Sequence, residues 1–173
     1  MVQPGDVIEN PVTGERITFV RTSAESGGAL AEMDLDLSPS AFLAAEHLHL
    51  RQEERFDVVQ GRIRLRCRGD ESVHGAGESV VVPAGAPHAW APDGDKGARV
   101  RLTFTPGAGI EDFFDEFFRH GREGRTNAKG MPPLLVTARL GLAHDMYLPG
   151  PPVPLQRAAF RILTGAARLV HRD

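Results

Sequence analysis

The sequence predicts an all-β domain of antiparallel strands, arranged as a sandwich or small barrel and followed by α-helices. Between about residues 12 and 106, short runs of alternating apolar and polar residues are separated by turns, and no helical pattern lies between them. After residue 108 the apolar residues recur at helical spacing. We therefore expect a β-domain over residues 1–108 and a helical extension over residues 109–173, packed on the barrel or on a dimer partner.

Composition and charge narrow the class of protein. The 173 residues are 41% hydrophobic and 25% charged, which is enough for one good core. The net charge of −3 gives no broad basic field for nucleic acid, and every apolar run is too short to span a membrane. The single cysteine, Cys67, excludes an internal disulfide, and the first ten residues lack a signal-peptide pattern. We expect a cytoplasmic protein with neither a nucleic-acid nor a membrane partner.

Seven segments carry the strand pattern. The clearest, residues 62–68 (RIRLRCR), places Ile63, Leu65 and Cys67 on one face and four arginines on the other. Residues 98–105 (ARVRLTFT) repeat this alternation. One buried face and one wet face are typical of an antiparallel sheet. The remaining predicted strands cover residues 16–20, 29–37, 46–50, 55–59 and 78–83.

Three segments of the last third carry a helical pattern. Residues 110–118 (IEDFFDEFF) place one isoleucine and four phenylalanines at helical spacing, with acidic residues in the first turn. We interpret these phenylalanines as core that covers a sheet face or a dimer partner. A linker rich in Gly, Pro and charge follows over residues 121–133, and residues 133–146 and 154–172 predict two further helices.

Two histidines and a glutamate near residue 50 suggest a metal site. His47 and His49 have the same parity on one strand, so their rings point the same way, about 7 Å apart along the chain. A turn at residues 51–53 would put Glu54 at the start of the next strand, facing the same interior together with Phe56. Two imidazoles and a carboxylate suit a divalent transition metal.

A second segment, residues 77–92, supplies a further histidine. A valine strand leads into a Pro-Ala-Gly turn, and His88 follows that turn. The histidine can therefore swing back over the same interior, and Trp90 shares its parity and is expected to line the pocket beside it.

These two segments resemble the two motifs of the cupin superfamily, and the chain is similar to single-domain (type-2-like) cupins with a C-terminal helical extension. The first motif is G-x5-H-x-H-x3/4-E-x6-G, with Ala41 here in place of its leading glycine. The second motif is G-x5-P-x-G-x2-H-x3-N, with Pro92 in place of its final asparagine. The matching residues are His47, His49, Glu54 and Gly61 in the first motif and Gly77, Pro83, Gly85 and His88 in the second.

The resemblance implies a jelly-roll antiparallel β-barrel with C-terminal α-helices. It implies that one divalent metal ion (Fe, Mn, Ni, Cu, Co or Zn) is bound by His47, His49, Glu54 and His88. The six-residue spacing to Gly61 selects Glu54 rather than its neighbour Glu53 as the ligand. Because cupins commonly pair, we also expect a homodimer.

An ion held by three histidines and one glutamate keeps open positions for a small-molecule substrate. The resemblance favours a mononuclear metal-dependent oxidoreductase, a dioxygenase of the kind quercetin dioxygenase represents, acting on a small, largely apolar or aromatic oxygenated substrate. Glu54 can also serve as a catalytic base, and Trp90 and Phe56 are expected to shape the substrate pocket.

Two other functions stay open at this point, so the sequence leaves undecided whether the protein is an enzyme. One is a non-redox metal-assisted isomerase, epimerase or lyase that acts on a sugar or keto acid, which a polar pocket would favour. The other is a cupin that binds a small ligand without turnover.

Overall fold

The computed structural model describes residues 2–43 and 45–170. The β-part comprises β1 (Val7–Asn10), β2 (Glu15–Arg21), β3 (Ala31–Leu37), β4 (Leu48–His49), β5 (Glu53–Cys67), β6 (Asp70–Gly75), β7 (Ser79–Val82), β8 (His88–Pro92) and β9 (Ala98–Thr105). The C-terminal part comprises α1 (Ile110–Arg122), α2 (Leu134–His144), β10 (Met146–Tyr147) and α3 (Val153–Val170). None of the helices in these residues is long and apolar enough to cross a membrane.

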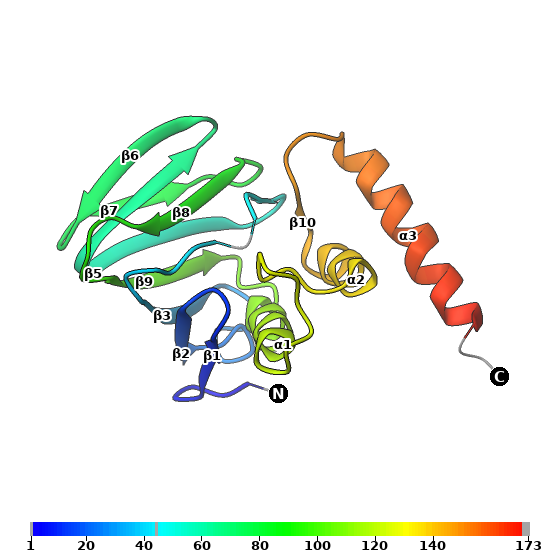
Figure 1. Cartoon of the computed structure of the whole chain (residues 1–173), viewed down its shortest axis with the longest axis horizontal. Coiled ribbons are helices and arrows are strands. Elements are labelled where there is room, and N and C mark those ends of the chain that lie inside the picture. The colour runs from blue at the N-terminus through cyan, green and yellow to red at the C-terminus, as the bar shows by residue number, and fades with distance from the viewer. Residues whose placement is uncertain (1, 44, 171–173) are drawn as a thin grey trace.

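Strand β5 organises the sheet, because four other strands pair with it. The strand order is β1-β2-β3-β9-β5-β6, and β7 and β8 also pair with β5. The first half of β5 is hydrogen-bonded to β9 and β7, and its second half to β8 and β6, always antiparallel. The second half of β5 therefore lies between β8 and β6, and Figure 1 shows β6 at one end of the sheet and β1 and β2 at the other. The fold is a jelly roll, but the strand pairs of the described residues do not close into the ring that we expected.

Strand β5 differs from the prediction, which placed separate strands on either side of Gly61. The chain continues as one strand through a bulge between Val58 and Gln60, and Gly61 takes a φ of 75°. A side chain at Gly61 would overlap the carbonyl oxygen of Gly97 on the approach to β9. Glycine therefore lets the strand bend here without ending, since it alone adopts a positive φ at little cost.

Sequence analysis predicted no strand for three of the nine β-domain strands, namely β1, β6 and β8. Strand β1 is only four residues long, and β6 is a mostly exposed polar strand in a hairpin with the second half of β5. Their pairing partners, rather than their own side chains, make them strands.

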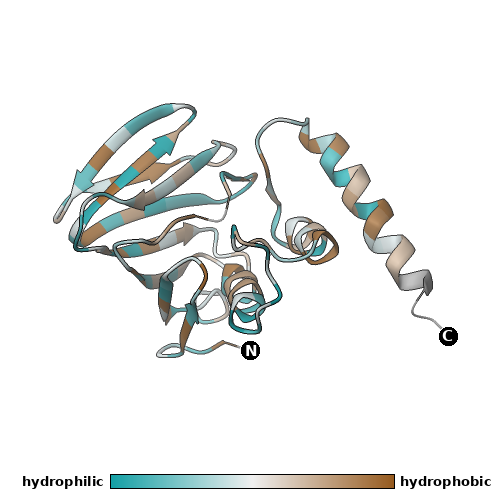
Figure 2. Ribbon diagram, in the orientation of Figure 1, coloured by the Kyte–Doolittle hydropathy of each residue, from teal (hydrophilic) through white to brown (hydrophobic). Residues whose placement is uncertain are grey.

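The core lies between the inward faces of the sheet. Alternate residues of β2, β3, β5 and β9 are fully buried, and Figure 2 shows the matching alternation of apolar and polar bands along the strands. The largest of these side chains are Ile17, Phe19, Met33, Leu35, Phe56, Ile63, Leu65, Leu102 and Phe104.

The C-terminal elements pack against the open end of the β-domain. Helix α1 approaches the sheet through Phe114, whose ring centroid lies 5.9 Å from that of Phe104 in β9. Helix α2 ends at His144, two residues before the predicted end, because Asp145 turns into the left-handed conformation and β10 follows. Strand β10 pairs with β4, and α3 packs on α2. The predicted last helix extended to residue 172, and residues 171–172 lie outside the described residues. The domain division at residue 108 stays a prediction.

Candidate metal centre

Four predicted ligands, drawn from separate segments, meet at one point. His49 lies on β4, with His47 just before it; Glu54 is the second residue of β5, and His88 begins β8. A backbone bridge joins the two motifs, because the His47 and His88 amides each donate to the other's carbonyl, at 3.1 and 2.8 Å. One atom from each of the three imidazoles and the carboxylate lies within 4.8 Å of all the others. Neighbouring Glu53 points outward and is exposed.

The nitrogens that face one another are all Nε2. The Nε2 of His88 lies 2.9 Å from Oε2 of Glu54, and the Nε2 of His49 lies 3.5 Å from the same oxygen. The Nε2 atoms of His47 and His49 are 3.1 Å apart. Three side-chain nitrogens and a carboxylate oxygen thus enclose a space of the size that one cation fills.

The outer ring nitrogens fix the tautomers of two of these histidines. The Nδ1 of His47 lies 3.1 Å from the carbonyl oxygen of Ala45, and the Nδ1 of His88 lies 3.0 Å from that of Ala86. A carbonyl only accepts, so each Nδ1 carries a proton, and the Nε2 of each ring presents a lone pair when that ring is neutral. The Nδ1 of His49 is buried and has no hydrogen-bond partner in the described part of the chain. Preoriented lone pairs beside a carboxylate fit a divalent metal ion.

The electrostatics of the cluster favour the protonation states of His47 and Glu54 that metal binding requires. Loss of solvation, together with the nearby His49 and His88, lowers the pKa of His47 to about 3. Burial alone would raise the pKa of Glu54, but hydrogen bonds from His49 and His88 hold it well below its usual range. Burial likewise opposes a charge on His88, yet the bond to Glu54 raises the pKa of His88 overall. Near neutral pH, Glu54 is therefore ionised and His47 is uncharged, as metal binding requires.

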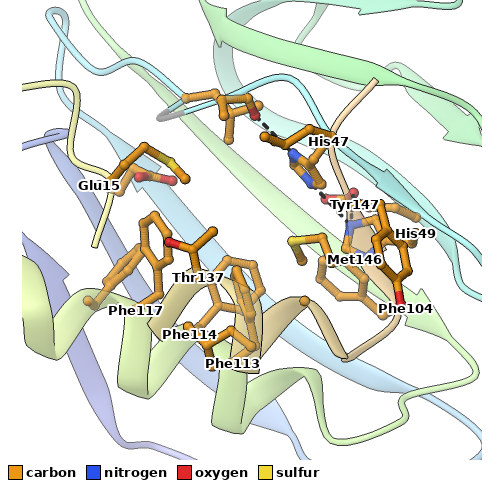
Figure 3. A pocket seen from close by; sticks show the side chains of 18 of the residues that line it. Glu15, His47, His49, Phe104, Phe113, Phe114, Phe117, Thr137, Met146 and Tyr147 are labelled. Atoms are coloured by element: carbon orange, nitrogen blue, oxygen red, sulfur yellow. Dashed lines mark hydrogen bonds and ion pairs between the residues drawn. The ribbon is translucent and has the colours of Figure 1, made fainter. Parts of the chain in front are cut away.

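An apolar cavity that is partly open to solvent lies beside the cluster. His47, His49 and Glu54 form part of its wall, whereas the fully buried His88 lies behind them. Trp90 also lines the cavity, but Phe56 lies in the core and does not. The predicted substrate contacts of Trp90 and Phe56 stay predictions. Figure 3 shows the histidines at one side of the cavity and side chains of the C-terminal helices across from them.

Sequence analysis missed most of this wall. The C-terminal extension contributes side chains from α1, α2, β10 and α3, among them Phe113, Phe114, Phe117, Leu140, Tyr147 and Phe160. The helical spacing identified the α1 phenylalanines as apolar, but not what they face. The β-domain also contributes Glu15, which we overlooked by starting its strand at residue 16. Glu15 has the parity of the buried Ile17 and Phe19, and a carboxyl in that register is the signal that could have found it.

Comparison with known proteins agrees with this fold and this cluster. The family model described as "Cupin domain" matches residues 33–105, a range that includes all four ligands. Residues 33–105 form a cupin domain. No curated protein matches the chain.

Solved cupin structures support the same assignment. The RmlC-like cupin from Shewanella frigidimarina superposes with a TM-score of 0.50 at 23% identity, over 61% of this chain and 86% of that one. The cupin domain of Schizosaccharomyces pombe Cnp3 superposes with a TM-score of 0.50 at 12% sequence identity, over 64% of this chain and 74% of that one. Oxalate decarboxylase from Lactobacillus farciminis superposes with a TM-score of 0.50 at 18% sequence identity. The match covers 58% of this chain but only 31% of the oxalate decarboxylase chain. At these identities the similarity establishes the fold alone.

Proposed function

We propose that the cupin domain binds one divalent metal ion through His47, His49, Glu54 and His88 and carries out a dioxygenase-like oxidation. The substrate is a small, largely apolar or aromatic molecule with oxygen donors. One observation carries this proposal: the ligand cluster forms part of the wall of a cavity that is otherwise almost entirely apolar. A metal site with free positions beside a dry pocket is suited to chemistry on a bound organic molecule.

The bound ion would supply a Lewis acid for substrate oxygens and, if it is redox-active, electrons for O2. The protein's own residues do the rest. The Glu54 carboxylate is ionised and can accept a proton from a substrate hydroxyl. Trp90 and the α1 phenylalanines keep water away from the bound molecule and offer aromatic faces for packing.

The character of the cavity separates the proposed oxidation from its main alternative. An isomerase or epimerase for sugars would need several polar groups to hold the substrate hydroxyls. Apart from the metal ligands, the polar or ionisable side chains of this wall are few, chiefly Glu15, Thr137 and the Tyr147 hydroxyl, against many aromatic and aliphatic ones. This lining supports an apolar or aromatic substrate.

The metal half of the proposal is tested by elemental analysis of the purified protein. We expect about one ion per chain in the wild type and at least a tenfold weaker affinity in His47→Ala, His49→Ala and His88→Ala. The matched control is His74→Ala, which removes an imidazole that is hydrogen-bonded to Ser72 on β6, outside the cluster. Equal metal content in all variants would show that the cluster does not hold the ion.

The chemical half is tested by oxygen uptake. The metal-loaded protein is mixed with catechols and other aromatic chelators, and His88→Ala serves as the inactive reference. Oxygen consumption that requires His88 supports the dioxygenase proposal. A loaded protein that never consumes O2 but converts a sugar or keto acid would establish the non-redox alternative. Tight substrate binding without any conversion would establish a binding module.

We also propose the homodimer expected from the sequence, with an interface on α3. Three large apolar side chains of α3 are exposed: Leu155 by 57%, Ile162 by 72% and Leu163 by 37%. Apolar side chains gathered on one helix are typical of protein contacts. Light scattering after size-exclusion chromatography should give twice the chain mass for the wild type and one chain mass for Ile162→Glu. A monomeric wild type would refute the dimer.

A further inference from the structure

The cavity has a second functional group besides the metal cluster: the carboxyl of Glu15. Glu15 is the first residue of β2 and points to the same side as Ile17 and Phe19, so it is only 5% exposed. Figure 3 shows it among the cavity side chains, across the view from His47 and His49 and on the same side as Phe117. A carboxyl in an apolar wall costs several kcal/mol unless it finds a hydrogen-bond partner.

Within the described residues, only one of the two carboxyl oxygens of Glu15 has a hydrogen-bond partner. The Thr13 hydroxyl donates to Oε2 of Glu15 at 2.5 Å. Within the described residues, Oε1 has no hydrogen-bond partner, and no arginine, lysine or histidine nitrogen lies within ion-pair distance of Glu15. Burial raises the pKa of Glu15 to about 7, so the group carries a proton through the mildly acidic range and can both donate and accept.

A purely structural role would explain the hydrogen bond between Thr13 and Glu15, but not why the Glu15 side chain lies in the cavity wall. Thr13 is fully buried, and its bond to Glu15 braces the turn between β1 and β2. That role uses one oxygen and would be served as well by a shorter polar side chain pointing into the turn. The remaining oxygen belongs to a residue that lines the cavity, where a bound molecule is the available partner.

We propose that Glu15 is a second substrate-binding group, which hydrogen-bonds a hydroxyl at the end of the ligand remote from the metal. The contact between the ligand and the metal rests on the proposed function, whereas the hydrogen bond between the ligand and Glu15 does not. The substrate class is then an elongated, mainly apolar or aromatic molecule with oxygen donors for the metal at one end and a hydroxyl at the other. The α1 phenylalanines contact the apolar middle.

Matched ligand pairs test this proposal by calorimetry. 3,4-Dihydroxybiphenyl and 3,4,4′-trihydroxybiphenyl differ only in the remote hydroxyl, and the corresponding stilbenes repeat the comparison at a greater length. The protein is loaded with Zn(II), which supports binding without redox chemistry. In the wild type we expect the remote hydroxyl to strengthen binding about tenfold for at least one of the two lengths.

Three variants assign that gain to Glu15. Glu15→Leu should abolish it while binding the ligand without the hydroxyl at least as tightly, and Glu15→Gln should retain part of it. Thr13→Val breaks the contact within the turn but should keep the gain, whereas a purely structural role predicts that Thr13→Val and Glu15→Leu behave alike. If Glu15→Leu does not fold, the comparison of Glu15→Gln with the wild type is decisive. A hydroxyl effect equal in the wild type and the folded Glu15 variant would overturn the proposal.

Failure of the metal site is distinguishable from failure of the Glu15 proposal. If the chain binds no metal, the same comparison is made on the metal-free protein with 4-phenylphenol and biphenyl, which need no ion. A hydroxyl preference that depends on Glu15 would then support the second binding group even though the proposed function had failed. The absence of any such preference would overturn it.

Discussion

Met146 lies opposite His49 across the two-stranded sheet of β10 and β4. The strand that carries His49 is therefore held by a segment almost one hundred residues later in the chain. The Leu50 amide donates to the Asp145 carbonyl at 3.0 Å and extends this pairing by one residue. The C-terminal extension thus supports the His/Glu cluster and also forms part of the cavity wall.

Asp145 should be a stabilising residue of this junction. It sits in the left-handed conformation with a φ of 51° at the end of α2, and its carboxylate contacts Arg51 at 2.5 Å and Arg157 at 3.0 Å. Both arginines are substantially exposed, so each pair contributes at most about 1 kcal/mol. We expect Asp145→Ala to lower the free energy of unfolding by about 1–2 kcal/mol, because it also loses a residue that tolerates this backbone.

Asp145→Asn is the control, since asparagine tolerates the left-handed region but carries no charge. Chemical denaturation should rank the wild type above Asp145→Asn and Asp145→Ala lowest. Equal stability of all three proteins would mean that this junction is held by its backbone pairing alone.

Gly61 should be far less tolerant of alanine than other glycines with positive φ. Both Gly61, at 75°, and Gly77, at 87°, adopt a conformation that is strained for alanine, but a Cβ at Gly77 would meet open space. We expect Gly77→Ala to cost about 1–2 kcal/mol from backbone strain. Gly61→Ala should cost at least about 2 kcal/mol more, because its methyl group would meet the Gly97 backbone. Similar thermal midpoints for the two variants would contradict the close approach of β5 and β9.

Glu15 should make the stability of the metal-free protein depend on pH. Below about pH 4.5 both folded and unfolded chains hold its proton; between 4.5 and about 7 only the folded chain does. The stabilising contribution of Glu15 is therefore complete at low pH and falls as pH rises toward 7. Relative to Glu15→Gln, we expect the wild type to lose up to about 3 kcal/mol across this range. Urea denaturation at pH 5 and pH 8 measures this difference; a constant gap between the two proteins would show that Glu15 titrates normally.

Phe118 should couple the helical extension to the β-domain. It is 1% exposed, lines the cavity, and belongs to the same hydrophobic core cluster as the buried residues of the strands. We expect Phe118→Ala to lower the free energy of unfolding by about 3–4 kcal/mol, as other buried phenylalanine truncations do. Phe42, 36% exposed, provides the matched truncation and should cost less than about 1 kcal/mol. Comparable losses of unfolding free energy in the two variants would mean that the packing of α1 does not depend on the burial of Phe118.

The sequence by itself identified the four side chains that form the His/Glu cluster. His47 and His49 share a strand parity, and Glu54, Gly61, Gly77, Pro83, Gly85 and His88 fall at the spacings of two cupin motifs, so local order along the chain was enough to nominate the cluster. The alternation of apolar residues likewise predicted most strands and the three helices. These features are local, because a strand or helix repeats every two or 3.6 residues and a turn needs particular residues at fixed offsets.

Only the tertiary structure decided what surrounds the cluster. Strand β5 runs unbroken past Gly61 because β7, β8 and β9 pair along it, and β10 exists because β4 lies beside it. The side chains that line the cavity beside the cluster, from Glu15 in β2 to Phe160 in α3, come from nearly the whole length of the chain. Their meeting depends on contacts between residues far apart in sequence, and no periodicity along the chain encodes which distant surface an apolar face will cover.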